Sequence, residues 1–203
     1  MKESREKKDF FDHLAEKWDQ EVPREKTWAA LEDLLSPWKE TFRGAAILDA
    51  GCGTGQLAAW LARIQDRPRL TAALDPSRAM LARLTLQAPS AAPLLARGET
   101  LPFRAGVFDF VLAMGLFPHL EAPLDFLLES RRVLRPGGWL LVFHTASRAR
   151  INQVHREAGP PVDRDLVLPA SRVGEMLTAG GFLPGPWRDD ESGWLVSGRK
   201  EKT

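Results

Sequence analysis

The chain of 203 residues is poor in cysteine, in long apolar runs and in charge of one sign. Its single cysteine excludes a disulfide framework within the chain and is typical of a reducing compartment. Its longest apolar stretches fall far short of the roughly 18 residues that a membrane-spanning helix needs. Basic and acidic residues number 28 and 27, so bulk charge does not favour nucleic-acid binding. We therefore expect a cytoplasmic protein with no membrane partner and no nucleic-acid partner.

No repeat and no low-complexity linker divides the chain, so one domain is predicted over residues 1–203. Residues 1–43 carry apolar side chains at helical spacing and predict two helices. Over residues 44–145 short apolar runs alternate with helical patterns, which is typical of βαβ units and a parallel sheet. Residues 146–203 predict further helices and a closing antiparallel pair around Gly193. Strands are expected at 45–50, 69–75, 92–97, 108–114 and 139–145, and helices at 55–65, 77–87, 123–135 and 171–180.

The most informative segment is ILDAGCGTGQ (47–56), in which an apolar run leads into three glycines. In a parallel sheet, ligands bind beyond the carboxyl ends of the strands. Glycines at that place let the chain turn tightly and let a ligand approach the backbone. Asp75 ends the next expected strand, where a carboxylate can accept hydrogen bonds from both hydroxyls of a ribose. The two features together indicate a ligand that contains adenosine.

Several ligands are compatible with such a loop. A dinucleotide fingerprint has a small residue where Gln56 stands, and the Lys-Ser/Thr pair of a phosphate-binding P-loop is absent. The loop also has no basic residue, which is unusual for a diphosphate site and acceptable for a positively charged sulfonium. Asp49 adds a negative charge at the entry of the loop. A tight strand-to-helix turn without any ligand remains an alternative for this motif alone.

Six segments resemble class I S-adenosylmethionine-dependent methyltransferases. ILDAGCGTG resembles their first motif, and LDPSRAML resembles their second-strand motif. ETLPFRAGVFDFVLAMGLFPHL and LLESRRVLRPGGWLLV are similar to the fourth- and fifth-strand segments of the ubiquinone- and menaquinone-biosynthesis group (methyltransferase type 11). FFDHLAEKWD resembles the lid helix, and LTAGGF the helix end before the hairpin. The resemblance implies an α/β, Rossmann-like fold with a seven-stranded, mostly parallel sheet, an antiparallel C-terminal hairpin, helices on both faces and a helical lid (1–43).

The resemblance further implies S-adenosylmethionine as the cofactor, S-adenosylhomocysteine as its product and a small-molecule acceptor. By position, Asp49, Gly51 and Gly53 would hold the methionine end of the cofactor. The other positions so assigned are Asp75 at the ribose, Pro76, Gly98 and Glu99 at the adenine, Met114 and Gly115 beside the sulfonium, and Phe11 and Trp18 in the lid. Arg97 stands where the family usually has an aspartate for the adenine amino group, and a guanidinium has no acceptor. That contact is therefore lost, rerouted or made by backbone, and Arg97→Asp is expected to tighten cofactor binding.

Three histidines are candidate catalytic residues. His119 follows the expected strand 108–114 and His144 lies near the end of the strand 139–145, so both face the crevice. His155 would lie on the next helix, one turn after Asn152, and His144 is the preferred base. Packed or surface histidines are the alternative. No metal is expected, because two histidines without a nearby carboxylate or thiolate make an incomplete site.

The sequence thus predicts an S-adenosylmethionine-dependent methyltransferase, as a monomer or a homodimer. A non-catalytic S-adenosylmethionine-binding module or sensor is the alternative, which Arg97 keeps open. An NAD-type oxidoreductase is disfavoured by Gln56 and by the LRPGG turn. The charged runs REKK (5–8) and RKEK (199–202) are interpreted as solvated.

Overall fold

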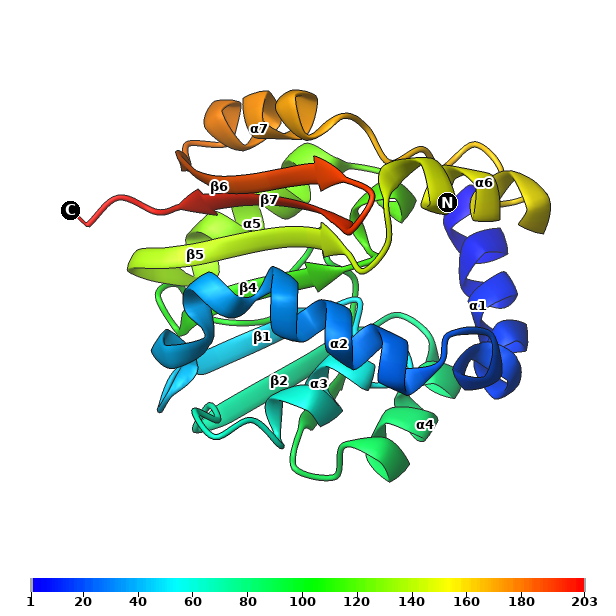
Figure 1. Cartoon of the computed structure of the whole chain (residues 1–203), viewed down its shortest axis with the longest axis horizontal. Helices are drawn as coiled ribbons and strands as arrows, with labels where there is room; N and C mark the ends of the chain where they lie inside the picture. The colour runs from blue at the N-terminus through cyan, green and yellow to red at the C-terminus, as the bar shows by residue number, and fades with distance from the viewer. Residues whose placement is uncertain (1, 203) are drawn as a thin grey trace.

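A seven-stranded sheet forms the centre of the computed structural model, which describes residues 2–202 and leaves Met1 and Thr203 outside the described residues (Figure 1). The strands are β1 (Ala46–Ala50), β2 (Leu70–Asp75), β3 (Ala92–Leu95), β4 (Phe108–Met114), β5 (Leu134–His144), β6 (Leu183–Asp190) and β7 (Gly193–Arg199). Their order is β3-β2-β1-β4-β5-β7-β6. Strands β1 to β5 pair in parallel, and β7 pairs antiparallel with both β5 and β6. The predicted mixed sheet with a closing antiparallel hairpin is confirmed.

Helices cover both faces of this sheet, as predicted. They are α1 (Lys2–Glu21), α2 (Arg24–Leu34), α3 (Gln56–Leu61), α4 (Arg78–Gln87), α5 (Pro123–Val133), α6 (Arg148–Ala158) and α7 (Ala170–Ala179), with 3-10 turns η1 (Ser36–Phe42) and η2 (Phe117–His119). One face of the sheet packs against α5 and α7 through Phe126 and Leu177. The other packs against α2 and α3 through Leu31 and Trp60. Every residue of β1 is buried, which is why the central parallel strands read as continuous apolar runs.

Several predicted boundaries differ from the structure; the helix predicted at 55–65, for example, ends at Leu61. The expected lid over residues 1–43 is divided: α1 lies across the strand ends, whereas α2 and η1 pack on the sheet and bury Leu34 and Phe42 in the core. Strand β5 begins at Leu134 rather than at residue 139. Its pairing with β4 shifts register where the expected Pro-Gly-Gly turn stands, and Gly137 takes a φ of 79° there. The glycines therefore bend the strand and do not end it.

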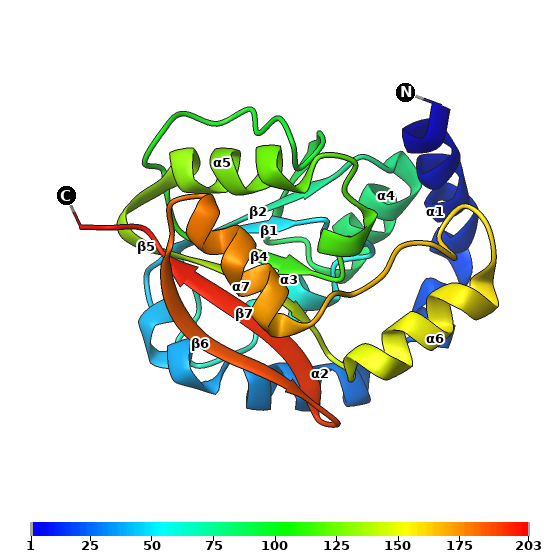
Figure 2. The same ribbon diagram turned by 90° about the horizontal axis from the view of Figure 1, so that it is seen from above.

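The topology reverses between β1 and β4. These two strands are neighbours, yet the chain leaves β1 for β2 on one side and β4 for β5 on the other. A crevice for ligands opens at the carboxyl ends of strands at such a switch point. Figures 1 and 2 show α1 and α6 together at this end of the sheet. No helix within residues 2–202 has the length and apolar character that crossing a membrane requires.

Candidate functional site

The glycine loop after β1 combines two packed glycines with one that is open. Gly51, Gly53 and Gly55 have φ values of 70°, 52° and 94°, which L side chains rarely adopt. A Cβ on Gly51 would lie 2.9 Å from Leu116, and one on Gly55 would lie 3.2 Å from the backbone of Leu84. A Cβ on Gly53 would meet nothing within 4 Å. The outer glycines thus permit close packing, and the middle one presents bare backbone to the crevice.

Asp49 is a buried carboxyl group without a charged partner in the described part of the chain. It is fully buried in β1, and neither of its oxygens makes a hydrogen bond of ordinary distance and angle within the described chain. Burial, with the charge of Asp75 adding to it, raises the pKa of Asp49 to about 8, and the amide of Ala58 opposes this rise. A buried carboxyl without a charged partner costs free energy when it ionises, unless a ligand supplies that partner. A cationic group in the crevice, such as the amino group or sulfonium of the cofactor, would supply it.

Asp75 ends β2 beside the same loop, as predicted. Its Oδ2 accepts a hydrogen bond from the Gly53 amide at 3.0 Å, and its Oδ1 accepts one from the Ser77 amide at 2.8 Å. Burial raises the pKa of Asp75 to about 6, and the two amides oppose this rise. Each oxygen retains a further lone pair, so an ionised Asp75 can still accept from a ribose. With Asp49 and Gly53, the site therefore fits S-adenosylmethionine.

The residues expected at the adenine lie on the other wall. Gly98 is buried, and a Cβ there would lie 3.1 Å from Phe126. Arg97 contacts two carboxylates: its Nη2 lies 3.0 Å from Oε1 of Glu99 and 3.3 Å from Oε2 of Glu121. Arg97 thus has acidic partners of its own, and it holds Glu99 beside the crevice. Sequence reasoning did not foresee Glu121, because its loop position carries no local signal.

Met114 and Gly115, which the resemblance assigns to the sulfonium, lie at the end of β4 at the switch point. Met114, half-buried, ends this strand, and Gly115 follows it with a φ of 72° and no atom within 4 Å of a Cβ position. Pro76, also half-buried, follows Asp75 directly. The roles predicted for Met114, Gly115 and Pro76 rest on the resemblance and stay predictions.

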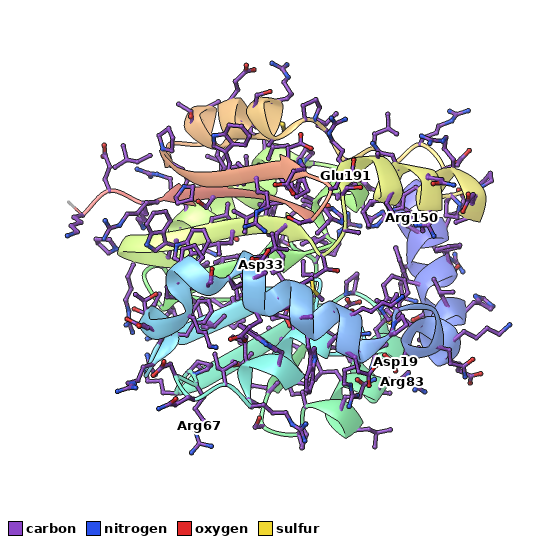
Figure 3. All side chains as sticks on the ribbon, in the orientation of Figure 1. Asp19, Asp33, Arg67, Arg83, Arg150 and Glu191 are labelled. Atoms are coloured by element: carbon purple, nitrogen blue, oxygen red, sulfur yellow. The ribbon has the colours of Figure 1, made fainter. Side chains whose placement is uncertain are left out.

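Helix α1 is fastened over the glycine loop by two aspartates. Asp19 accepts a hydrogen bond from the hydroxyl of Thr54 at 2.7 Å and pairs with Arg83 of α4 at 3.1 Å, and Figure 3 shows Asp19 and Arg83 side by side. Asp12 accepts hydrogen bonds from the Ser77 hydroxyl and the Ala79 amide. Since Thr54 belongs to the loop and Ser77 caps α4, the lid is anchored to the elements that form the cofactor crevice.

The expected lid aromatics meet the acceptor side. The rings of Phe11 and Trp18 lie 6.3 Å apart, and Phe11 also lies 5.1 Å from the ring of His119. His119 in turn lies 4.9 Å from the ring of His155 on α6. The structure therefore brings together one lid residue and two of the three predicted histidines.

His144 is the third predicted histidine, and its environment makes it a weak base. It ends β5, is 4% exposed, and its Nε2 has no hydrogen-bond partner within residues 2–202. Burial, with repulsion from His119 and His155, lowers the pKa of His144 to about 3. The imidazole is therefore neutral near pH 7. In that form it can accept or donate a hydrogen bond, but it is a poor proton acceptor.

Two sequence interpretations change with the structure. Asn152 does not offer its amide to the crevice: the amide donates to the Val167 carbonyl at 3.1 Å and accepts from the Val167 amide at 2.7 Å. Lys7, from the run interpreted as solvated, is 7% exposed and lies 2.7 Å from Oδ1 of Asp165. Asp165 was not predicted as a site residue. Its partners are distant in sequence, so no local spacing announces them.

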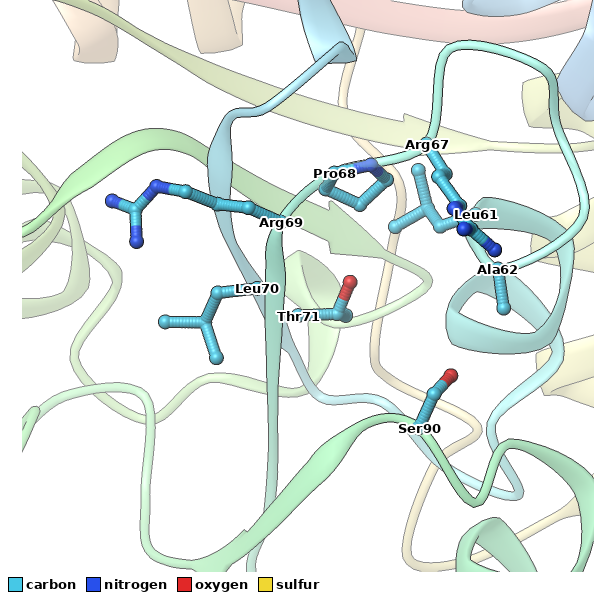
Figure 4. Close-up of a pocket in the computed structure, with 8 residues that line it drawn as sticks. All are labelled: Leu61, Ala62, Arg67, Pro68, Arg69, Leu70, Thr71 and Ser90. Carbon is cyan, nitrogen blue, oxygen red and sulfur yellow. The ribbon is translucent and has the colours of Figure 1, made fainter.

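Neither a metal cluster nor the hollow of Figure 4 adds to this site. In the described part of the chain, no group of three or more His, Cys, Asp or Glu residues could hold a metal ion. The hollow in Figure 4 lies at the amino end of β2, whereas ligands of such sheets bind at the carboxyl ends. Its lining residues are Leu61, Ala62, Arg67, Pro68, Arg69, Leu70, Thr71 and Ser90.

Burial raises the pKa of the Cys52 thiol, so this cysteine of the glycine loop packs as a small apolar residue.

The fold and the site thus define a Rossmann-like protein with a crevice for an adenosine-bearing cation. Comparison with known proteins agrees. Residues 48–142 match the family model described as a methyltransferase domain. The chain is 36% identical to a ubiquinone biosynthesis O-methyltransferase of Roseobacter denitrificans over 57% of its length and 46% of that protein's. It is 34% identical to a tRNA U34 carboxymethyltransferase of Cellvibrio japonicus over 62% of its length and 36% of that protein's.

A solved structure shares the fold over nearly the whole chain. The crystal structure of a SAM dependent methyltransferase from Aquifex aeolicus superposes with a TM-score of 0.72 at 21% identity, over 93% of this chain and 97% of that one. The chain therefore has the fold of the class I S-adenosylmethionine-dependent methyltransferases, and residues 48–142 match the model of a methyltransferase domain. The chain matches less than half the length of the two curated relatives.

Proposed function

We propose that the protein transfers the methyl group of S-adenosylmethionine to a small molecule bound between α1, α6 and the ends of β4 and β5. The observation that carries this proposal is the buried carboxyl of Asp49, which has no charged partner within residues 2–202, near the open backbone of Gly53. A dinucleotide would bring two phosphates to that place, where the ionised Asp75 would repel them and their charge would oppose ionisation of Asp49. A cofactor with a cationic methionine end is attracted there.

The residues of the chain divide this task between holding the cofactor and covering it. Asp75 would accept from the ribose hydroxyls, and Asp49 and the glycine loop would face the methionine end. Bound S-adenosylmethionine supplies a methyl group activated by the adjacent sulfonium. Phe11 and Trp18, carried by the anchored helix α1, would exclude water from the crevice. Alignment of the acceptor and exclusion of water are the main requirements of such a transfer.

The acceptor class is tested by following the methyl group. The protein is incubated with S-adenosylmethionine that carries a tritiated methyl group and with a cell extract divided into small-molecule and RNA fractions. We expect label in small molecules, and more than tenfold less label with Asp75→Ala. Label in RNA alone would overturn the small-molecule assignment and leave the methyltransferase assignment intact.

RNA is the second candidate acceptor because a similar relative bears the name of a tRNA-modifying enzyme. The formal net charge of +1 does not support it, because phosphate backbones are bound through an excess of lysine and arginine. Cofactor binding without transfer to either fraction would instead favour the non-catalytic module.

A further inference from the structure

Asp165 joins three elements on the acceptor side of the crevice. It lies between α6 and α7 and is 7% exposed. Its Oδ1 lies 2.7 Å from Nζ of Lys7 on the lid helix, and its Oδ2 lies 2.7 Å from Nδ1 of His119 after β4. Its main-chain oxygen accepts a hydrogen bond from Nδ1 of His155 on α6. Asp165 thus orients two imidazoles that face the lid, the partly exposed ring of His119 and the buried ring of His155.

These contacts fix the tautomer of each ring. Burial raises the pKa of Asp165, but the hydrogen bonds from His119 and Lys7 outweigh it and lower the pKa overall, so the carboxyl is ionised at neutral pH. An ionised carboxylate can only accept, so Nδ1 of neutral His119 must carry the hydrogen. Its Nε2 is then an unprotonated lone pair. No residue of the described chain forms a hydrogen bond to this Nε2, and the side chain is 14% exposed.

The three histidines differ in their surroundings and therefore in their fitness to act as a base. His144 is neutral and desolvated, with a pKa lowered to about 3. Burial also lowers the pKa of His155, whose Nδ1 donates to an uncharged carbonyl. Of the three, only His119 has a carboxylate hydrogen-bonded to its Nδ1, and this contact leaves Nε2 free to accept a proton from an acceptor. The charged or titratable groups that face it are Asp165, Lys7 beyond Asp165, His155 and His144.

We propose that His119 is the general base of the acceptor site and that Asp165 is the positioning residue that holds its ring in the productive tautomer. The proposal rests on the methyl transfer proposed above. It names the acceptor class: a hydroxyl on a flat aromatic ring, because such a group must lose a proton and because Phe11 and His155 place rings beside His119. The O–H proton passes to Nε2, the oxygen lone pair forms the bond to the methyl carbon, and the carbon–sulfur pair stays on sulfur, which becomes neutral.

Lys7 gives the lid a part in this arrangement. Its ammonium and the Asp165 carboxylate form a buried pair between α1 and the segment after α6, with side chains 9% and 7% exposed. Removing one partner of a buried pair leaves an uncompensated charge. Closure of α1 therefore keeps Asp165 paired while that carboxylate orients His119.

The test measures the tautomer directly, by nitrogen-15 NMR of the four histidine side chains, each assigned by its own substitution. In the wild-type protein with S-adenosylhomocysteine at pH 7.5, we expect His119 to be protonated at Nδ1 and bare at Nε2. Asp165→Asn, whose amide can donate as well as accept, should give a mixture of tautomers, and Asp165→Glu should restore the wild-type state. Asn152→Ala is the matched control, because it loosens the same segment at Val167 without touching Asp165.

Catechol serves as the acceptor probe. Added to the complex with S-adenosylhomocysteine, it should shift the Nε2 resonance of His119 more than those of His144 and His155, and His119→Gln should weaken its binding at least threefold. Wild-type His119 protonated at Nε2, an equal change of tautomer in Asn152→Ala, or a catechol shift confined to His144 would each overturn the proposal. Affinity for S-adenosylhomocysteine should stay within twofold in His119→Gln and Asn152→Ala, which leave the contact between Lys7 and Asp165 in place, and absence of that binding in the wild type would instead refute the proposed function.

Discussion

Arg97 is fixed by two carboxylates, and this changes what its replacement should do. Arg97→Asp would remove the cation between Glu99 and Glu121 and add a third negative charge. Like charges at such distances destabilise each other, and the side chain is partly exposed, so the effect is moderate. We now expect S-adenosylhomocysteine binding to weaken about threefold to tenfold, opposite to the tightening expected from the sequence. Calorimetry in low and high salt checks this, and tighter binding by the variant would restore the sequence-based interpretation.

At this scale the sequence predicts residues whose role follows from their place on a strand. Asp49 and Asp75 lie at the ends of β1 and β2, and topology brings those ends to one crevice. Asp165 could not be predicted, because its partners His119 and Lys7 are 46 and 158 residues away. The weak basicity of His144 was also hidden, since it follows from burial that only the packed chain creates.

The lid helix is the element whose hold on the crevice can be tested separately from chemistry. Asp19→Ala removes hydrogen bonds from Thr54, Arg83 and Gln87 to one side chain. We expect S-adenosylhomocysteine to dissociate about tenfold faster, because charge-assisted hydrogen bonds each contribute about 1.5–3 kcal/mol, part of which water replaces. Stopped-flow displacement measures this rate.

Asp9→Ala on the same helix is the control. Asp9 is exposed, and its nearest basic partners, Arg5 and Lys8, lie 3.9 Å and 3.7 Å away on α1 itself. Exposed pairs of this kind contribute little, so the dissociation rate should not change. Equal rates for Asp19→Ala and the wild type would show that α1 does not retain the cofactor.

Elements were predicted well where burial alone determines them. Strand β4 has the predicted bounds, Phe108–Met114, because it is an apolar run buried on both faces of a parallel sheet. The first 43 residues were predicted less well. Their helical periodicity shows that α2 has an apolar face, but periodicity does not reveal whether that face meets the sheet or covers a ligand. Gln56 is similar: its amide donates to the Val22 carbonyl at the corner between α1 and α2, a contact that only tertiary structure provides.

The whole molecule should respond to pH through its buried carboxyl groups. The pKa of Asp49 is raised to about 8 in the folded protein, so the folded state binds a proton that the unfolded state has already released. This proton adds to the free energy of unfolding. Its contribution is fully present below the pKa of Asp49 in the unfolded chain, near 4, and is lost as pH rises to about 8. His144 acts in the opposite direction, because its folded pKa is lowered to about 3, and its effect is confined to pH below about 6.5.

Between pH 6.5 and 8, the free energy of unfolding should therefore fall by about 1–2 kcal/mol more in the wild type than in Asp49→Asn, since one group contributes at most about 1.4 kcal/mol per pH unit. The variant should also bind S-adenosylhomocysteine more weakly, because the amide cannot pair with the amino group of the ligand as a charge. Urea unfolding at several pH values checks the difference. Parallel curves for the two proteins would show that Asp49 does not titrate in this range.

The fold as a whole could be predicted because strand and helix patterns alternate from the glycine loop to β5, and because the pattern around Gly193 and the resemblance both indicated a closing antiparallel hairpin. The acceptor could not be predicted in the same way. Its walls come from α1, α6 and the segment that contains Asp165, which meet only when the sheet has brought the ends of β4 and β5 together. Side chains that depend on such meetings leave no periodic signal in the sequence.

The most direct measurement is calorimetric titration of the wild-type protein and Asp75→Ala with S-adenosylhomocysteine and with NADH. We expect the wild type to bind S-adenosylhomocysteine and not NADH, with affinity that falls as pH is lowered through about 6, where Asp75 becomes protonated. Loss of the charge-assisted ribose contact should weaken binding by Asp75→Ala on the order of tenfold to a hundredfold. Asp75→Asn keeps an acceptor for the Gly53 or Ser77 amide. It should also weaken S-adenosylhomocysteine binding, but it should change the unfolding midpoint less than Asp75→Ala does. Binding of NADH in place of S-adenosylhomocysteine, or S-adenosylhomocysteine binding that is indifferent to Asp75, would contradict the assignment of this crevice.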